Sequence, residues 1–222
     1  MKENINLINN KKDSSENEYA RTLQFIFIKA TLDLFPDAKI TIQHSVGKGI
    51  FGEISKKTNL NEKDIQDIKI KMKELIDKDL PINKIKVDKE KAINIFKSYD
   101  MKDKVLLLKQ VDFKTVNLYE LDGRYDYFYG HMNKRTGDIK AFDLIYYENG
   151  FILRRPNDYQ TFTLLEFVEQ RKITKIFRET EKWLNILGVG NVGALNDKID
   201  KGELISLMLF FLKNLDLILK LI

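Results

Sequence analysis

The stretch that decides the fold runs from Tyr19 to Ile54 and reads YARTLQFIFIKATLDLFPDAKITIQHSVGKGIFGEI. Up to Leu34 its apolar residues recur three or four positions apart, and further apolar residues widen this face. Such spacing predicts a helix that is buried on most sides, and Pro36 follows its end. From Lys39 onward apolar and polar residues alternate on both sides of a glycine-containing turn, which predicts a β-hairpin.

The composition allows a sizeable core and excludes several kinds of site. Of the 222 residues, 43% are hydrophobic, which suits one large domain or two small ones. The absence of cysteine excludes disulfides, thiolate catalysis and cysteine-ligated zinc, and two histidines leave little for an imidazole site. We therefore predict no metal site and no cofactor. A net charge of +5 permits contact with RNA or a nucleotide without itself predicting such contact.

Residues 1–18 read as a polar leader. They contain neither the apolar core nor the small-residue cleavage site of a signal peptide. We expect this leader to be disordered. We also expect the protein to be cytoplasmic, a setting with which a cysteine-free chain is compatible.

Caps and turn residues mark the elements that follow the hairpin. Asn61 is placed to cap a helix that Pro81 stops. A short strand-like piece from Ile82 to Val87 comes next, and Asp88 is placed to cap a second helix through Phe96.

The region from Lys104 to Asp143 is rich in Val, Leu, Phe and Tyr, with turn signals at Asp122-Gly123 and Thr136-Gly137-Asp138. We predict a series of antiparallel strands here, continued by a hairpin through Asn149-Gly150. After Thr161 the helical spacing returns.

The C-terminal part reads as a glycine-punctuated loop at residues 188–193 and a last helix over residues 201–222. The apolar core of this helix, LISLMLFFL, is too short to span a bilayer, so we expect a packed or partner-binding helix and no membrane contact. The whole chain is predicted to be α+β. A helix-hairpin-helix unit packs on a largely antiparallel sheet, and a helical C-terminal segment follows.

Two motifs carry candidate chemistry. Residues 47–52 match the G-x-G-x-x-G pattern of a phosphate-binding loop, but a strand follows where that loop needs a helix, so we interpret them as a hairpin turn. The run from Tyr125 to His131, with basic residues nearby, offers stacking faces and phosphate contacts to a nucleotide or single-stranded RNA. Alternating aromatics on a sheet also serve simply as core and surface pairs, and this alternative stays open.

Several segments carry a family resemblance. They resemble the second additional domain of threonyl-tRNA synthetases, the N-terminal part that edits mischarged tRNA in those enzymes. The segments are Ala30–Lys39, Gly49–Ile54, Leu60–Ile82 and Tyr125–Leu144.

A second set of segments looks like the version of this domain that is fused ahead of bacterial uridine kinase-like nucleoside kinases. The segments are Tyr19–Leu23, Gln43–Ser45, Tyr119–Gly123, Tyr125–Gly130, Gly150–Arg154, Phe177–Trp183 and Gly188–Gly193. The sequence has no G-x-x-x-x-G-K-[ST] motif, so the ATP-binding loop of those kinases has no counterpart in it. We expect a truncated gene, a split protein or a shifted reading frame.

The resemblance also implies where editing groups would stand. Editing synthetases carry H-x-x-x-H on the first helix and a later Cys-x-x-x-His, which fall at Arg21 and Phe25 and at about Phe128 and Met132. A guanidinium, two phenyl rings and a thioether cannot replace imidazole and thiolate in proton transfer or zinc ligation. His131 lies one position from the last of these places.

These observations predict three regions and one ligand site. Residues 1–18 are the leader, residues 19–160 an editing-type domain, and residues 161–222 a helical segment leading towards an absent kinase domain. The predicted function is a non-catalytic accessory module of a nucleoside kinase that binds a nucleotide, RNA or a partner domain. A kinase domain in trans and self-association through the C-terminal helix are further expected partners. The alternative is a tRNA-editing deacylase with a rebuilt site. The predicted ligand-binding residues are Arg21, His44, Lys48, Tyr127, Tyr129, His131 and Arg154.

Overall fold

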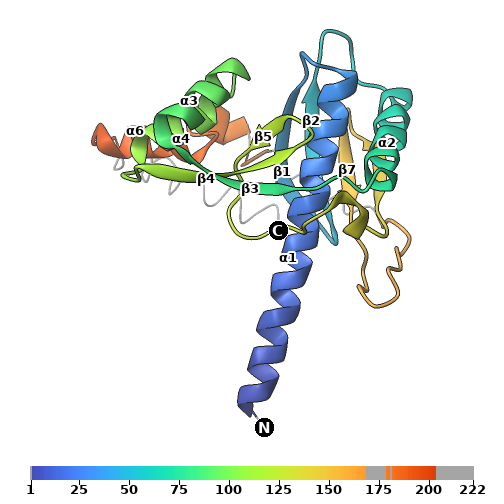
Figure 1. The fold of residues 1–222 in the computed structure, drawn as a ribbon. Coiled ribbons are helices and arrows are strands. Elements are labelled where there is room, and N and C mark those ends of the chain that lie inside the picture. Colours follow the sequence, from blue (N-terminus) through green and yellow to red (C-terminus); the bar gives the residue numbers. More distant parts are fainter. Residues whose placement is uncertain (1, 169–178, 181, 204–222) are drawn as a thin grey trace. The chain divides into compact units, whose positions relative to one another are not determined.

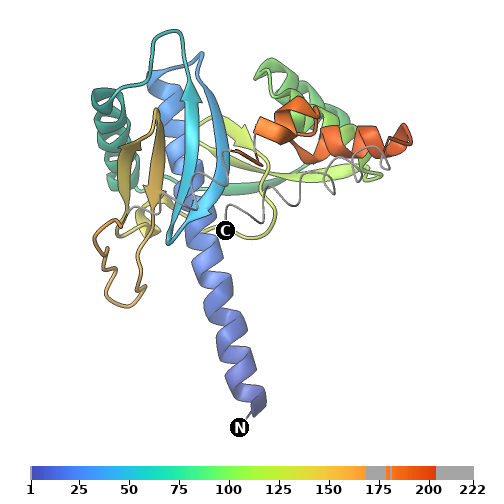
Figure 2. The same ribbon diagram turned by 180° about the vertical axis from the view of Figure 1, so that it is seen from behind.

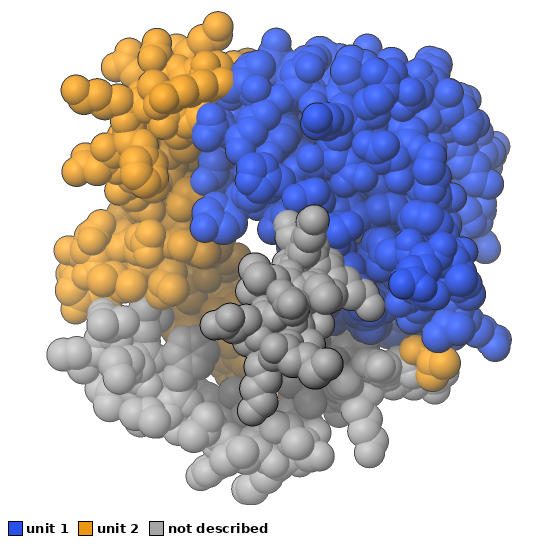
Figure 3. All heavy atoms as spheres, turned by 60° about the horizontal axis from the view of Figure 1, so that its bottom comes forward, with its two compact units in different colours: residues 1–85, 117–167 blue, residues 86–116, 168–222 orange. Residues whose placement is uncertain are grey.

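The computed structural model describes residues 2–168, 179–180 and 182–203. These residues belong to two compact units, which are coloured separately in Figure 3. Unit 1 comprises residues 1–85 and 117–167, and unit 2 comprises residues 86–116 and 168–222. The chain leaves unit 1 within strand β3 (Asn83–Asp88) and returns within β4 (Thr115–Leu121). The excursion through residues 86–116 has no counterpart in the three predicted regions.

Helix α1 (Lys2–Leu34) is the long helix at the N-terminus (Figure 1), and it carries the buried face that the sequence predicts. Phe25, Ile26 and Phe27 are fully buried. The helix begins far earlier than predicted, because the polar residues expected to form a disordered leader continue it. Glu16 near the end of that leader forms ion pairs with Lys48 (3.0 Å) and Arg155 (3.7 Å), which tether it to the hairpin and to the residue after β7.

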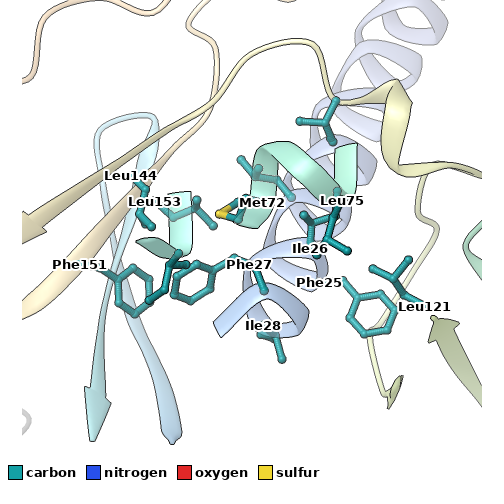
Figure 4. Packing of buried hydrophobic residues seen from close by; sticks show 14 of the residues in the cluster. Phe25, Ile26, Phe27, Ile28, Met72, Leu75, Leu121, Leu144, Phe151 and Leu153 are labelled. Carbon is teal, nitrogen blue, oxygen red and sulfur yellow. The ribbon is translucent and has the colours of Figure 1, made fainter. Parts of the chain in front are cut away.

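A four-stranded antiparallel sheet with the order β1-β2-β7-β6 packs on α1 and α2 (Figure 2). The predicted hairpin is confirmed and supplies two of its strands. Phe27 of α1 and Phe151 of β7 lie side by side with ring centroids 4.3 Å apart (Figure 4). The elements are β1 (Lys39–Val46), β2 (Gly49–Ser55), α2 (Glu62–Asp77), β6 (Asp143–Tyr147) and β7 (Gly150–Arg154).

The predicted cap of α2 is confirmed. The Asn61 side chain accepts a hydrogen bond from the Asp64 backbone N–H (3.1 Å), and the Asp64 carboxylate accepts one from the Asn61 N–H (3.0 Å). This reciprocal pair satisfies two donors that a helix start otherwise leaves unpaired. It also fixes where the chain turns from the hairpin into α2.

A second sheet, ordered β3-β4-β5, contains β5 (Arg124–Asp126), which is joined to β4 through the predicted turn at Asp122-Gly123. The expected strands between β5 and β6 are absent from the described residues, and a loop with one 3-10 turn, η1 (Thr136–Asp138), takes their place. This loop is held by the Thr136 hydroxyl, which donates to the Leu75 carbonyl (2.7 Å) and accepts from the Leu80 N–H (2.8 Å).

Unit 2 contains α3 (Lys89–Ser98), α4 (Lys102–Gln110) and α6 (Val192–Asp200). The prediction of strands from Lys104 is wrong, because leucine and lysine are good helix formers and Leu108 is buried on one side of α4. Asp88 precedes α3 as predicted, but its side chain makes no capping hydrogen bond.

Gly188 and Gly190 lie in the predicted loop, but Gly193 lies in the first turn of α6. Most of the predicted last helix lies outside the described residues, and residues 201–203 form a turn. Among the residues described, no helix is both long and apolar enough to cross a membrane. The predicted α+β class is confirmed.

Candidate functional site

The candidate site lies where α1 meets the segment from Tyr127 to Asn133. The Arg21 guanidinium donates a hydrogen bond to the His131 carbonyl oxygen (3.2 Å). It also lies close to Gly130, because a Cβ placed on that glycine would come within 2.8 Å of the Arg21 Cζ. Gly130 has a φ of +99°, a conformation that favours glycine. The Arg21 guanidinium therefore occupies the space that a side chain at residue 130 would take.

The four positions at which the resemblance implies editing groups lie on α1 and on the segment that contacts it. Arg21 contacts the segment as just described, and one helical turn later Phe25 packs on Phe128 with ring centroids 5.4 Å apart. Phe25 is fully buried, and Met132, buried as well, belongs to the same hydrophobic cluster. Apolar packing thus occupies three of the four positions.

Two hydroxyl groups fix this segment to the rest of unit 1, and a third holds the chain that follows it. The Thr22 hydroxyl accepts a hydrogen bond from the Asn133 N–H (2.9 Å), and the Tyr119 hydroxyl donates to the Gly130 carbonyl (2.6 Å). Further along the chain, the Tyr19 hydroxyl donates to the Ala141 carbonyl (2.6 Å). The backbone of the segment is therefore held in place by buried partners.

The side chains of the segment divide into buried and exposed groups. Tyr129 is 85% exposed, and His131 is also exposed. Tyr127 is half-buried. An exposed phenol ring offers a stacking face, and the nearby guanidinium carries a positive charge, which together suit an aromatic ligand with a phosphate.

The remaining predicted residues lie on the four-stranded sheet and have structural partners. His44 follows an irregularity in β1, and its ring centroid lies 5.3 Å from that of Phe51. Burial lowers the pKa of His44 below its ordinary value, because it disfavours the charged imidazolium. Lys48 sits in the β1–β2 turn, where Glu16 pairs with it.

Arg154 is also engaged, since it pairs with Asp143 (3.4 Å) and donates to the Leu165 carbonyl. Burial of the Asp143 carboxyl acts to raise its pKa, but the ion pair with Lys69 (2.6 Å) and the Arg154 charge outweigh it, so the pKa is lowered. These contacts make Arg154 part of a partly buried charge network that links β6 and β7. The seven predicted residues thus fall into two groups, and only Arg21 and the segment with Tyr127, Tyr129 and His131 are in contact.

Sequence reasoning missed the residues that position the segment. Thr22 is fully buried on α1, where the pattern of apolar spacing gave it no weight. Asp126 is also fully buried and accepts a hydrogen bond from the Tyr127 N–H (2.6 Å). An aspartate directly before a run of aromatics was the available signal for it. Within the part of the chain that the structure describes, no group of three or more His, Cys, Asp or Glu side chains could hold a metal ion.

Together, the buried helix, the hairpin and the loop that closes on α1 form an α+β unit. No family model matches the chain. It is similar to threonine–tRNA ligases from Methylobacillus flagellatus (29% identity over 121 residues, 54% of this chain and 19% of that protein) and from Bdellovibrio bacteriovorus (30% over 146 residues, 64% and 22%). It is also similar to the threonine–tRNA ligase from Haloquadratum walsbyi (28% over 174 residues, 71% and 27%). The chain therefore contains a threonyl-tRNA synthetase-like region and spans about a fifth to a quarter of the length of these relatives.

Proposed function

We propose that unit 1 is a non-catalytic, synthetase-like module that binds the end of an RNA strand or a nucleotide. Arg21, Tyr127, Tyr129 and His131 form its contact surface. The observation that carries this proposal is the packing of Phe25, Phe128 and Met132 at the positions that the resemblance assigns to editing groups.

The chemistry of these three side chains supports a binding function and opposes a hydrolytic one. A deacylase needs a group that transfers a proton or activates water, usually an imidazole, a carboxylate or a bound metal. Two phenyl rings and a thioether supply none of these. All three side chains belong to or pack against the hydrophobic cluster of unit 1.

The exposed rim of the same place retains groups that bind nucleic acid ends. Base stacking on an aromatic ring contributes about 1–3 kcal/mol per base, and Tyr129 presents its ring to solvent. Arg21 is anchored by the His131 carbonyl, so its charge is held in position before a ligand arrives. Since the backbone beneath is fixed by hydroxyl groups, little loop ordering opposes binding.

The test combines hydrolysis and binding measurements on the full chain. We expect no release of amino acid from mischarged tRNA, and saturable binding of a fluorescent CCA-ended RNA in an anisotropy titration. Tyr129→Ala should weaken that binding by about fivefold or more. Phe113→Ala, which removes a 67% exposed ring from unit 2, is the matched control and should have no effect. Hydrolysis that His131→Ala abolishes would instead establish the alternative, a deacylase with a rebuilt site.

We further propose that the module acts beside a uridine kinase-like nucleoside kinase domain that a separate chain supplies. We also propose that copies of this chain associate with one another. The support is the resemblance of segments such as Tyr119–Gly123 and Gly150–Arg154 to the kinase-fused version of this domain. Mixing the chain with a purified kinase domain of that type should shift both on a sizing column. Self-association is tested by deleting residues 202–222, which should convert an oligomer into a monomer.

A further inference from the structure

Unit 2 contains a half-open pocket of about 400 Å³ between α3 and α4. Its floor is formed by Met101, Val105 and Leu106, and each of these side chains is only partly buried. Lysines stand around this apolar floor, and one carboxylate lies among them. The charged lining residues are Lys97, Lys102, Lys109 and Asp100.

The pocket has a net positive rim. Lys102 lies 3.9 Å from Asp100, a long contact between exposed groups. Lys97 and Lys109 are exposed, and neither forms an ion pair within the described residues. Asp100 thus offsets the charge of Lys102, whereas the charges of Lys97 and Lys109 are available to an incoming anion. An ammonium group binds phosphate, sulfonate or carboxylate as a point charge, without demanding one geometry.

The walls of the pocket are held in place by contacts within unit 2. The Gln110 side chain donates to the Gly193 carbonyl (2.9 Å) and accepts from the Asn196 amide (3.2 Å), which fixes α4 to α6. Leu106 fits against Gly193, where a Cβ would come within 3.1 Å of the Leu106 Cγ. At the other end, the Met101 N–H donates to the Phe96 carbonyl (2.9 Å) at the α3–α4 turn. The pocket is therefore formed before a ligand binds.

We propose that this pocket binds a small organic anion with an apolar body, such as an aryl or acyl compound that carries a phosphate, sulfonate or carboxylate. The volume lies within the range of about 300–1,000 Å³ that is usual for small-molecule sites. The apolar floor takes the body of the ligand, and Lys97 and Lys109 take its charge. Among the described residues that line the pocket none is aromatic, so base stacking along an extended RNA strand is not what it offers.

The test uses 1-anilinonaphthalene-8-sulfonate, which combines an apolar body with one anionic group. Titrated into the full chain at low salt, it should bind saturably, and NMR shifts should be largest for the Met101, Val105 and Leu106 methyl groups. The Lys97→Glu/Lys109→Glu variant should bind it about tenfold more weakly or worse. The matched control, Lys91→Glu/Lys114→Glu, changes the net charge equally at exposed residues of unit 2 outside the pocket, and should bind within about twofold of the wild type.

Several results would overturn this inference: no saturable binding, an equal loss in both variants, or shifts that map elsewhere in the chain. Binding of an RNA oligomer that depends on Lys97 and Lys109 while the sulfonate does not bind would also overturn it, in favour of a nucleic acid surface. Circular dichroism of both variants checks that α3 and α4 stay folded. The outcome does not depend on the proposed function of unit 1, since none of its contact residues is changed.

Discussion

Replacing Phe25 with alanine tests whether a position that the resemblance assigns to an editing histidine is part of the core. Phe25 is fully buried, and its ring packs on that of Phe128 at 5.4 Å. Truncating a buried phenylalanine costs about 3–5 kcal/mol. The lost ring pair places this case towards the upper end of that range. With a urea dependence of about 2 kcal/mol per molar, the unfolding midpoint should fall by roughly 2 M.

The two units carry different spectroscopic probes, which makes this assay specific. Tyr99 is the one tyrosine outside unit 1, so the near-ultraviolet circular dichroism of tyrosine reports mainly on unit 1. Trp183, the single tryptophan, reports on unit 2 by fluorescence. Tyr129→Ala removes an exposed ring nearby and should change stability by less than about 0.5 kcal/mol. If Phe25→Ala keeps the wild-type midpoint but weakens RNA binding, Phe25 is a ligand contact and the reasoning is refuted.

Three further substitutions test the contacts that shape the site and unit 1. Gly130→Ala should lower the unfolding free energy more than Gly123→Ala. Both glycines have a positive φ, but a Cβ meets the Arg21 guanidinium only at Gly130. Urea titration measures the unfolding free energy of both variants. Thr136→Ala should cost about 2 kcal/mol or more, since it leaves two backbone groups without their hydroxyl partner, whereas Thr136→Ser should retain most of the stability. The pKa of Asp143 is lowered in the folded state, so the ionised carboxylate stabilises the fold fully above the unfolded pKa of about 3.9. This stabilisation is lost as the pH falls through the folded pKa. Asp143→Asn should therefore flatten the acid part of a plot of unfolding free energy against pH.

The parts of the fold that could be predicted are those with a local signal. The alternation on both sides of residues 45–49 predicts the β-hairpin, and Asn61 marks the start of α2. The prediction of strands from Lys104 is wrong because a short apolar run does not distinguish a helix from a strand. Burial of Leu108 within unit 2 favours the helix. The prediction of where α1 begins is wrong for a related reason. Its polar first half has no apolar stripe, and ion pairs of Glu16 with residues distant in sequence are invisible to periodicity.

The candidate site was predictable in its positions and not in its geometry. Alignment to the editing pattern places Arg21, Phe25, Phe128 and Met132 at corresponding sites, and these residues lie on α1 and on the segment that contacts it. Their packing could not be foreseen, because it depends on a loop that the sequence predicted as strands. Lys48 and Arg154 lie apart from the site for a different reason. Each forms an ion pair with a carboxylate from another part of the chain, which the sequence pattern does not indicate.

The way this loop is held bears on how function and stability separate in unit 1. The contacts of Thr22, Tyr119 and Gly130 involve the loop backbone, and so they are independent of the side chains at 127, 129 and 131. Substitution of the exposed side chains at 129 and 131 can therefore alter ligand contacts without moving the backbone that presents them. By contrast, Thr22→Val should leave the Asn133 N–H without its partner and loosen the whole segment. A binding defect that arises in Tyr129→Ala at unchanged stability then reports contact, whereas one that arises in Thr22→Val together with lost stability reports positioning.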